Sequence, residues 1–320
     1  MKVAEKIQPL SLEGIETYSL KERPSKVSYR DFGQPWTPGQ SFTDFIERLP
    51  HILAATALRE LAAAWVRARR QGHTVLLGCG AHVLKVGLSP VLIDLMRRGL
   101  LSGLALNGAG IIHDAEIAMV GRTSEEVGQE LGTGRFGMAE ETATFLNHAI
   151  NWGAAQGLGL GEAVGQKLLE AGCPFNHLSV VASAARREVP LTVHVALGTD
   201  IIHMHPSVNP AAVGAASHHD FRVFAALVSR LAGGLYINLG SAVVLPEVFL
   251  KAVSLARNLG HQLEPLTTAN LDFIQHYRPL TNVVRRPTQT QGQGFALTGH
   301  HEIMFPLLAA LVLEDWDKQP

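Results

Sequence analysis

The segment after one short apolar run combines small residues with groups that could transfer protons. Residues 104–106 are apolar, and Asn107-Gly108-Ala109-Gly110 follows them directly. Small residues let a ligand approach the backbone closely. His113 comes next, and because a neutral imidazole titrates near working pH, we predict it to be a general base with Asp114 and Glu116 as partners. The alternative is that Asp114 caps a helix and that His113 packs in the core.

Other histidines suggest a substrate pocket or a metal site. His203 and His205 are two residues apart, so an extended segment would place their rings on one side. His300 lies two residues before Glu302 near the C-terminus. Together with His113, these histidines could bind a divalent metal such as zinc. Their spacing matches no standard zinc motif, so the metal is an alternative to the substrate pocket.

Two glycine patterns could approach a phosphate. Gly78 and Gly80 flank Cys79 directly after the apolar run 74–77, where the chain turns toward a helix. The segment 132–137 matches G-x-G-x-x-G, but it follows a helical pattern rather than a strand, which does not fit a dinucleotide fingerprint. We expect Cys79 to be a buried structural thiol, and a reactive nucleophile is the alternative.

Short apolar runs separated by amphipathic segments must position these residues. Residues 1–40 lack helical periodicity, which predicts an extended arm before a single α/β domain at 41–320. Strands are predicted at 74–77, 104–106, 191–196 and 235–239, helices at 41–70, 89–98, 114–120, 123–131, 138–152, 161–171 and 246–259, and a loop at 288–294. Because the strands do not alternate, they indicate a doubly wound, mainly parallel sheet flanked by helices. Such sheets bind ligands at the carboxyl ends of their strands.

The composition narrows the function classes. Hydrophobic residues make up 47% and charged residues 17% of the 320 residues, and the charged fraction is below the usual value of about 25%. This predicts a large core and a homo-oligomer. A net charge of -1 excludes a basic nucleic-acid surface, and no apolar run is long enough to predict a membrane span. With two cysteines and no secretory pattern at its start, the chain is expected to be cytoplasmic.

Segments in order along residues 70–313 resemble the deoxyhypusine synthase family. They are Leu77–Leu88, similar to a glycine-containing segment of that family; Asn107–Asp114, similar to T-A-G-G-x-E-E-D; Gly134–Gly137, similar to R-x-G-N; Pro190–Asp200, similar to P-x-x-x-P-A-L-T-D; Gly240–Gly260; Thr267–Asn270, similar to N-T-A-Q; and Phe305–Leu308, which matches F-P-L-L. The resemblance implies a deoxyhypusine synthase-like, Rossmann-related fold that assembles as a tetramer and binds NAD near a subunit interface.

The polyamine pocket of that family is altered in this chain. The imine-forming lysine should fall within Arg285–Phe295, which contains no lysine. The paired glutamates are Ile112 and His113, and an aspartate is replaced by His300. True deoxyhypusine synthase activity is therefore not expected. The segment Asn107–Glu116 is more similar to the G-N-A-x-x-x-H-D-x-E segment of the archaeal-type ornithine cyclodeaminase domain, which favours an amino acid or amine substrate.

The resemblance and the residues together imply an NAD-dependent enzyme that acts on a small amine, amino acid or polyamine-like molecule. It would oxidise its substrate transiently, before an elimination, deamination, hydrolysis or transfer. The expected site residues are His113, Asp114, Glu116 and His300 for catalysis; Gly78, Gly80, Ala81, His82, Asn107, Gly108, Ala109, Gly110, Asp200, Thr268 and Ala269 for NAD; and His203, His205, Lys85 and Glu302 for substrate.

Two other functions stay open at this stage. One is a metal-dependent hydrolase on the same fold, with His113, His203, His205 and His300 as the pool of metal ligands. The other is a protein that binds a ligand or assembles without catalysing a reaction. Neither nucleic acid nor membrane is an expected partner.

Overall fold

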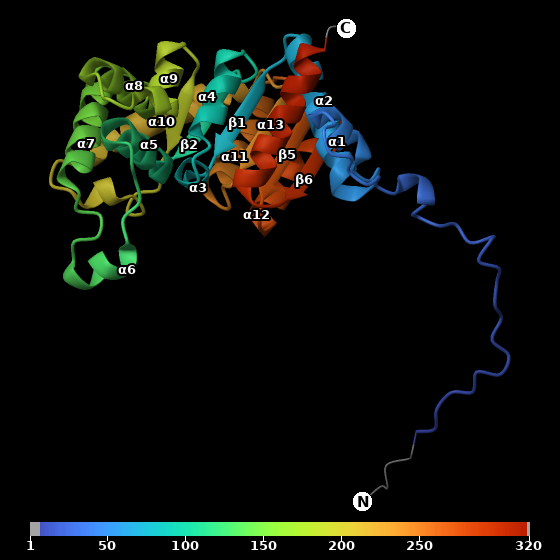
Figure 1. Ribbon diagram of the computed structural model, residues 1–320. Coiled ribbons are helices and arrows are strands. Elements are labelled where there is room, and N and C mark those ends of the chain that lie inside the picture. Colours follow the sequence, from blue (N-terminus) through green and yellow to red (C-terminus); the bar gives the residue numbers. More distant parts are fainter. Residues whose placement is uncertain (1–6, 319–320) are drawn as a thin grey trace, which may run out of the picture.

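A six-stranded parallel sheet forms the centre of the protein (Figure 1). The computed structural model describes residues 7–318. The strands are β1 (Val75–Cys79), β2 (Gly103–Asn107), β3 (Leu191–His194), β4 (Leu235–Leu239), β5 (Leu266–Asp272) and β6 (Gly292–Thr298). Their order across the sheet is β3-β2-β1-β4-β5-β6, and every pair of neighbours is parallel. The predicted doubly wound parallel sheet is therefore confirmed.

The direction of strand addition reverses beside β1. Cys79 pairs with Leu106 of β2 on one side and with Leu239 of β4 on the other. The loops that follow these three strands consequently begin at the same edge of the sheet. In open parallel sheets, ligands bind outside the carboxyl ends of the strands at this switch point.

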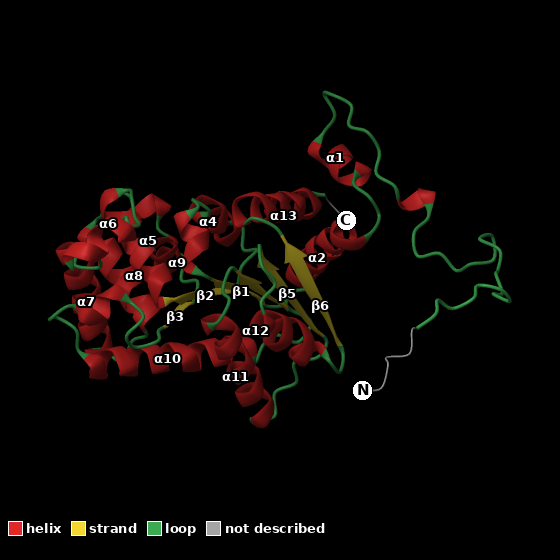
Figure 2. Cartoon of the chain, turned by 90° about the horizontal axis from the view of Figure 1, so that it is seen from below, coloured by secondary structure: helices red, strands yellow, loops and turns green. Residues whose placement is uncertain are grey.

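Helices cover both faces of the sheet (Figure 2). On one face lie α2 (Leu53–Arg70), α4 (Ser89–Arg97), α5 (Gly108–Val120) and α13 (His301–Asp317), and on the other lie α10 (Pro210–Val228) and α11 (Val244–Asn258). Around the β3 end of the sheet pack α7 (Glu140–Ala155), α8 (Leu160–Ala171) and α9 (Val180–Arg186). The short helices are α3 (Ala81–Lys85), α6 (Val127–Glu130) and α12 (Tyr277–Pro279). Two separate clusters of buried apolar side chains, one on each face, fill these layers.

The long helix predicted at 41–70 is divided in two. Ser41 caps α1 (Phe42–Arg48) through a reciprocal pair of hydrogen bonds with Asp44. Pro50 follows the end of α1, and a proline disfavours helical backbone in the residue before it. Arg59 of α2 donates hydrogen bonds to the carbonyl groups that the break leaves free, including that of Leu49 at 2.7 Å.

The prediction also missed α9, α10 and α13, and it placed the start of α5 at residue 114 instead of Gly108. β5 was not predicted, and β6 begins inside the predicted loop 288–294. In place of a helix at 123–131, α6 forms a single turn followed by a 3₁₀ turn at Leu131–Thr133. Residues 7–28 run away from the helices and strands (Figure 1), whereas Gln34 donates from its N–H to the carbonyl of Arg48 at 2.8 Å and joins the end of this segment to α1. The segment contains one 3₁₀ turn at Tyr29–Asp31. Within residues 7–318, no helix is long and apolar enough to span a membrane.

Candidate active site at the carboxyl edge of the sheet

The loops after β1 and β4 touch each other through their backbones. The N–H of Gly80 donates to the carbonyl oxygen of Leu239 at 2.8 Å. A Cβ at position 80 would overlap the carbonyl group of Gly240, so only glycine allows this approach. Gly240 itself has a φ of +67°, which again favours glycine. The predicted ligand-approach segment at the end of β1 thus lies at the switch point of the sheet.

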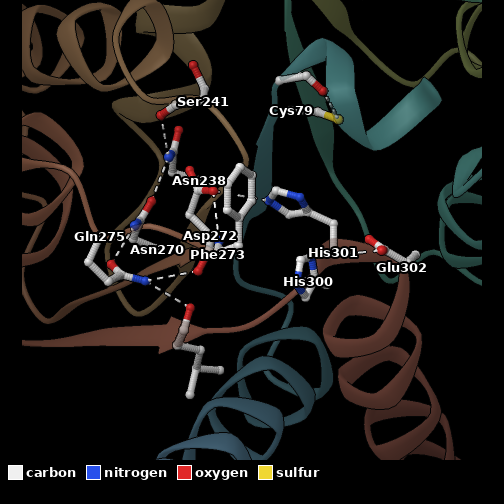
Figure 3. A network of polar contacts seen from close by, with 12 residues as sticks. Cys79, Asn238, Ser241, Asn270, Asp272, Phe273, Gln275, His300, His301 and Glu302 are labelled. Carbon is white, nitrogen blue, oxygen red and sulfur yellow. Dashed lines mark hydrogen bonds and ion pairs between the residues drawn. The ribbon is translucent and has the colours of Figure 1, made fainter. Parts of the chain in front are cut away.

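A chain of side-chain amides joins the ends of β4, β5 and β6 (Figure 3). Asn238 donates to the Oδ1 of Asn270 at 2.7 Å and to the carbonyl of Ser241 at 2.9 Å. Asn270 donates to Gln275 at 2.7 Å, and Gln275 donates to the carbonyl of Leu297 at 2.9 Å. These bonds fix the loops that border the switch point.

A buried histidine and a buried aspartate lie beside these loops (Figure 3). His301, the first residue of α13, is 2% exposed, and Asp272, the last residue of β5, is 4% exposed. The Nε2 of His301 lies 3.7 Å from the Oδ1 of Asp272. Burial lowers the pKa of His301, while the Asp272 carboxylate acts in the opposite direction. His301 is therefore held as a neutral imidazole near neutral pH.

Aromatic rings surround His301 on its outer side. The ring of His82, in the first turn of α3, meets it edge-on with centroids 5.7 Å apart. Phe273 meets it edge-on at 5.9 Å and also stacks on His300 at an interplanar angle of 7°. His300 is exposed and lies 3.9 Å from Glu302 across its Nδ1 and Oε1 atoms. Three predicted residues, His82, His300 and Glu302, are thereby brought to one part of the edge.

A second group of predicted residues lies at the ends of β2 and β3. The Oδ1 of Asn107 accepts from the N–H of Gly110 at 2.9 Å and caps α5. The carboxylate of Asp200 lies against Gly108, where a Cβ would overlap it. Burial raises the pKa of Asp200 to about 6. His203 accepts from the N–H of Gly198 at 3.2 Å, and burial lowers its pKa.

His113 belongs to a polar network between α5 and α7. Its Nδ1 lies 2.6 Å from the hydroxyl of Thr123, which donates in turn to Glu116. Thr142 of α7 also donates to Glu116, at 3.1 Å. Burial raises the pKa of Glu116, but the hydrogen bonds from His113 and the two threonines hold that pKa below its ordinary value. The predicted pairing of His113 with Glu116 is thus present, with Thr123 between them.

Asp114 makes different contacts from those predicted. It is fully buried, and its carboxylate accepts from the N–H groups of Val180 and Val181 at 2.7 and 3.1 Å and from the hydroxyl of Ser179 at 2.5 Å. Burial raises its pKa to about 6 despite these bonds. Asp114 therefore holds the start of α9. The alternative that it caps its own helix is wrong, because Asn107 caps α5, and the prediction that it orients His113 or contacts the NAD ribose stays a prediction.

Several other predicted cofactor residues lie inside strands. Gly78 is buried within β1, where a Cβ would overlap the hydroxyl of Tyr236. Thr268 is fully buried in β5 and donates to the carbonyl of Val283, and Ala269 packs in the core. Their contacts are structural. Ala81 begins α3, Ala109 lies in the first turn of α5, and Lys85 is exposed at the end of α3.

The histidines considered as a metal site lie on separate elements. His205 contacts Ser207 at 2.7 Å and Glu140 of α7 at 3.3 Å, whereas His300 precedes α13. Across the part of the chain that the structure describes, no group of three or more His, Cys, Asp or Glu side chains could hold a metal ion. Burial raises the pKa of the Cys79 thiol, so this residue is not a ready nucleophile.

Sequence reasoning did not select Asp272 or His301. A signal for His301 is present, because His301, Phe305 and Leu308 recur at the spacing of one helix face and all three are buried. Asp272 has no comparable signal, since the strand that it ends was not predicted.

Solved structures share the fold of this chain. No family model matches the chain, and no curated protein matches its sequence. Structural similarity connects it to the cyanobacterial arginine dihydrolase ArgZ (TM-score 0.52, 15% identity, 82% of this chain and 32% of that chain). It is also similar to AgrE in a ternary complex with ornithine and NAD⁺ (TM-score 0.53, 14% identity, 81% of this chain and 33% of that chain). A third similar structure is that of a proposed deoxyhypusine synthase from Entamoeba histolytica (TM-score 0.52, 10% identity, 88% of this chain and 96% of that chain).

The fold is deoxyhypusine synthase-like. At these identities the likeness concerns the fold, which is the one that the sequence motifs implied. The chain spans about a third of the length of the ArgZ and AgrE chains that it matches. The deoxyhypusine synthase-like part of this protein therefore corresponds to one region of those larger chains.

Proposed function

We propose that this protein is an NAD-dependent enzyme that acts on a small amine, amino acid or polyamine-like substrate by transient oxidation. The observation that carries the proposal is the backbone contact of Gly80 with Gly240 at the switch point of the sheet. Dinucleotides bind in this position on open parallel sheets. The oxidised nicotinamide supplies a hydride acceptor when bound, and the protein supplies orientation and proton transfer.

The groups at the end of β2 fit a dinucleotide. Asp200 is 7% exposed, and within residues 7–318 its Oδ2 has no hydrogen-bond partner. Asp200 follows β3, the strand next to β2 in the sheet, and its buried carboxylate could accept hydrogen bonds from a ribose. A 2′-phosphate would face the Asp200 carboxylate, so NAD should bind better than NADP.

The exposed polar groups near the switch point suit an amino acid or amine. The Glu302 carboxylate could bind a substrate ammonium, while His300 and His203 offer hydrogen bonds. Lys85 could bind a substrate carboxylate. AgrE was solved with ornithine and NAD⁺ bound together, which supports this substrate class.

A reaction of this type needs a second proton transfer after the oxidation, because a leaving amine must be protonated. We assign this step to His113, whose ring is held by Thr123 and Glu116 and has a side chain 17% exposed. The hydrogen-bonded threonine fixes the orientation of the ring.

Titration calorimetry tests the proposal. NAD⁺ should bind the wild-type protein, NADP⁺ should bind more weakly, and Asp200→Asn should reduce this preference. Turnover is tested first with L-ornithine and NAD⁺, and it is measured by the absorbance of NADH and by the ammonia released. Spermidine with NAD⁺ and borohydride should leave no butylamine adduct on any lysine. Absence of heat with both NAD⁺ and NADH would contradict the proposal.

A further inference from the structure

His301 is buried, and the polar groups next to its ring, the Asp272 carboxylate at 3.7 Å and the backbone of Leu271, do not reach full hydrogen-bond geometry. Neither ring nitrogen has a hydrogen-bond partner in the region from residue 7 to residue 318, although the side chain is 2% exposed. Buried polar groups in native proteins nearly always have a partner, and an exception requires an explanation. A purely structural role does not provide one, since leucine would fill the space without an unsatisfied nitrogen.

The position of His301 suggests what the nitrogen serves. Its Nε2 edge faces Gly240, where a Cβ would lie 2.8 Å from that nitrogen. Asp272 lies on one side at 3.7 Å, and the exposed residue His82 lies on another, with its ring centroid 5.7 Å away. The carboxylate, the buried imidazole and the exposed imidazole therefore form a series from the end of β5 to the start of α3. Figure 3 shows His301 and Asp272 in this arrangement.

We propose that Asp272 and His301 form a proton-accepting pair that serves the switch-point site through His82. This inference rests on the proposed function and adds to it the group that accepts the first proton. As the substrate N–H or O–H bond breaks, its electron pair stays on the heteroatom and the proton passes to His82. The oxidised nicotinamide, when bound, would supply the acceptor for the hydride that the neighbouring carbon gives up in this oxidation. His82 releases a proton to the Nε2 of His301, and a single water molecule can bridge the two rings.

Asp272 acts as the positioning residue of this series. Its Oδ1 accepts from the N–H of Phe273 at 2.8 Å, which fixes the carboxylate next to His301. A fixed carboxylate stabilises the imidazolium that forms when His301 takes a proton. The charged or titratable groups around His301 are Asp272, His82 and Glu302. His82 opposes protonation of His301, whereas the two carboxylates favour it.

Histidine NMR of the whole protein, with and without NAD⁺, tests the pair independently of turnover. The titration midpoint of His301 should fall in Asp272→Asn, rise in His82→Gln, and fall when NAD⁺ binds, because the nicotinamide ring carries a positive charge. His73 is the matched control, because it lies at the opposite edge of the sheet beside Gly233. Its signals should be unchanged by NAD⁺ and by both substitutions.

The outcomes separate this inference from the proposed function. If calorimetry shows NAD⁺ binding while the His301 titration is the same with and without NAD⁺, the pair does not serve the site and the inference fails. If His301 does not respond to either substitution, the inference fails as well. If NAD⁺ does not bind at all, the proposed function fails, and a response of His301 to both substitutions would leave only a coupled buried pair without a site to serve.

Discussion

The carboxylate of Asp200 lies directly against the α-carbon of Gly108, in the space that any other side chain at position 108 would fill. Asp200 follows β3, whereas Gly108 is the first residue of α5 after β2. The contact buries the carboxylate, and among the described residues its Oδ2 has no partner. The cost of burying this charge is therefore not offset within the chain.

Replacing Asp200 should stabilise the protein above neutral pH. Burial raises the pKa of Asp200 from 3.8 to about 6. The folded state thus binds this proton more tightly than the unfolded state, and stability falls as pH rises from about 4 to about 6. Asp200→Asn should gain up to about 3 kcal/mol at pH 8 and nothing below pH 4. Urea denaturation across this pH range measures the difference.

The same variant should lose affinity for NAD⁺ by about tenfold, the value of one charged hydrogen bond. A gain in stability without any loss of NAD⁺ affinity would show that Asp200 is buried for another reason. A loss of stability at every pH would contradict both parts of the prediction.

Gly80 should not tolerate even a methyl group. Its Cβ would overlap the Gly240 carbonyl, which belongs to backbone and cannot rotate away. We expect Gly80→Ala to lower the free energy of unfolding by about 1–3 kcal/mol. The matched control is Gly214→Ala in α10, where a Cβ meets nothing within 4 Å, and this variant should gain about 0.5–1 kcal/mol. Equal effects of the two substitutions would mean that the contact at the switch point is not tight.

The sequence predicted those elements whose local pattern agrees with their final environment. β1, β2 and β4 are continuous apolar runs because helices cover both of their faces, and all three were recognised. β6 has exposed residues and two glycines because it is the last strand of the sheet, so its pattern is that of a loop. β5 contains Thr268 and Asn270, whose side chains bond to the carbonyl of Val283 and to Asn238, residues that lie elsewhere in the sequence.

The predicted site residues show the same limit. The small residues after β2 were predicted from local composition to form a ligand-facing turn, and the structure places them in the first turn of α5. Asp114 could not be assigned correctly, because its partners Ser179, Val180 and Val181 are more than sixty residues away. The choice between His300 and His301 depended on which one faces the core, and only the spacing to Phe305 contains that information.

His113→Ala should affect both stability and turnover. Loss of the hydrogen bond to Thr123 should cost about 1–2 kcal/mol, and loss of a general acid or base should reduce turnover of L-ornithine about 10²–10⁴-fold. Thr123→Val is the matched control, because it breaks the same network and keeps the imidazole. It should lose similar stability, and because the imidazole remains although its ring is no longer held, turnover should fall by less than in His113→Ala. Similar activity of both variants per folded molecule would limit His113 to a structural role.

The protein should form a dimer or tetramer through the carboxyl edge of the sheet. Large apolar side chains are exposed in the loops after β4 and β5 and at the start of α13, including Ile274 at 51%, Tyr277 at 72% and Ile303 at 63%. Apolar residues that gather at one edge of a soluble protein mark an interaction surface, and the low charge of the whole chain favours a second copy as its partner. Sedimentation at micromolar concentration should show the oligomer, and Ile303→Glu should shift it toward monomer.

Leu259→Glu is the matched control for this prediction. Leu259 is 67% exposed at the end of α11 that lies away from the carboxyl edge, and the assembly should tolerate the substitution. A monomer in the wild type, or equal dissociation by both substitutions, would contradict an interface at this edge.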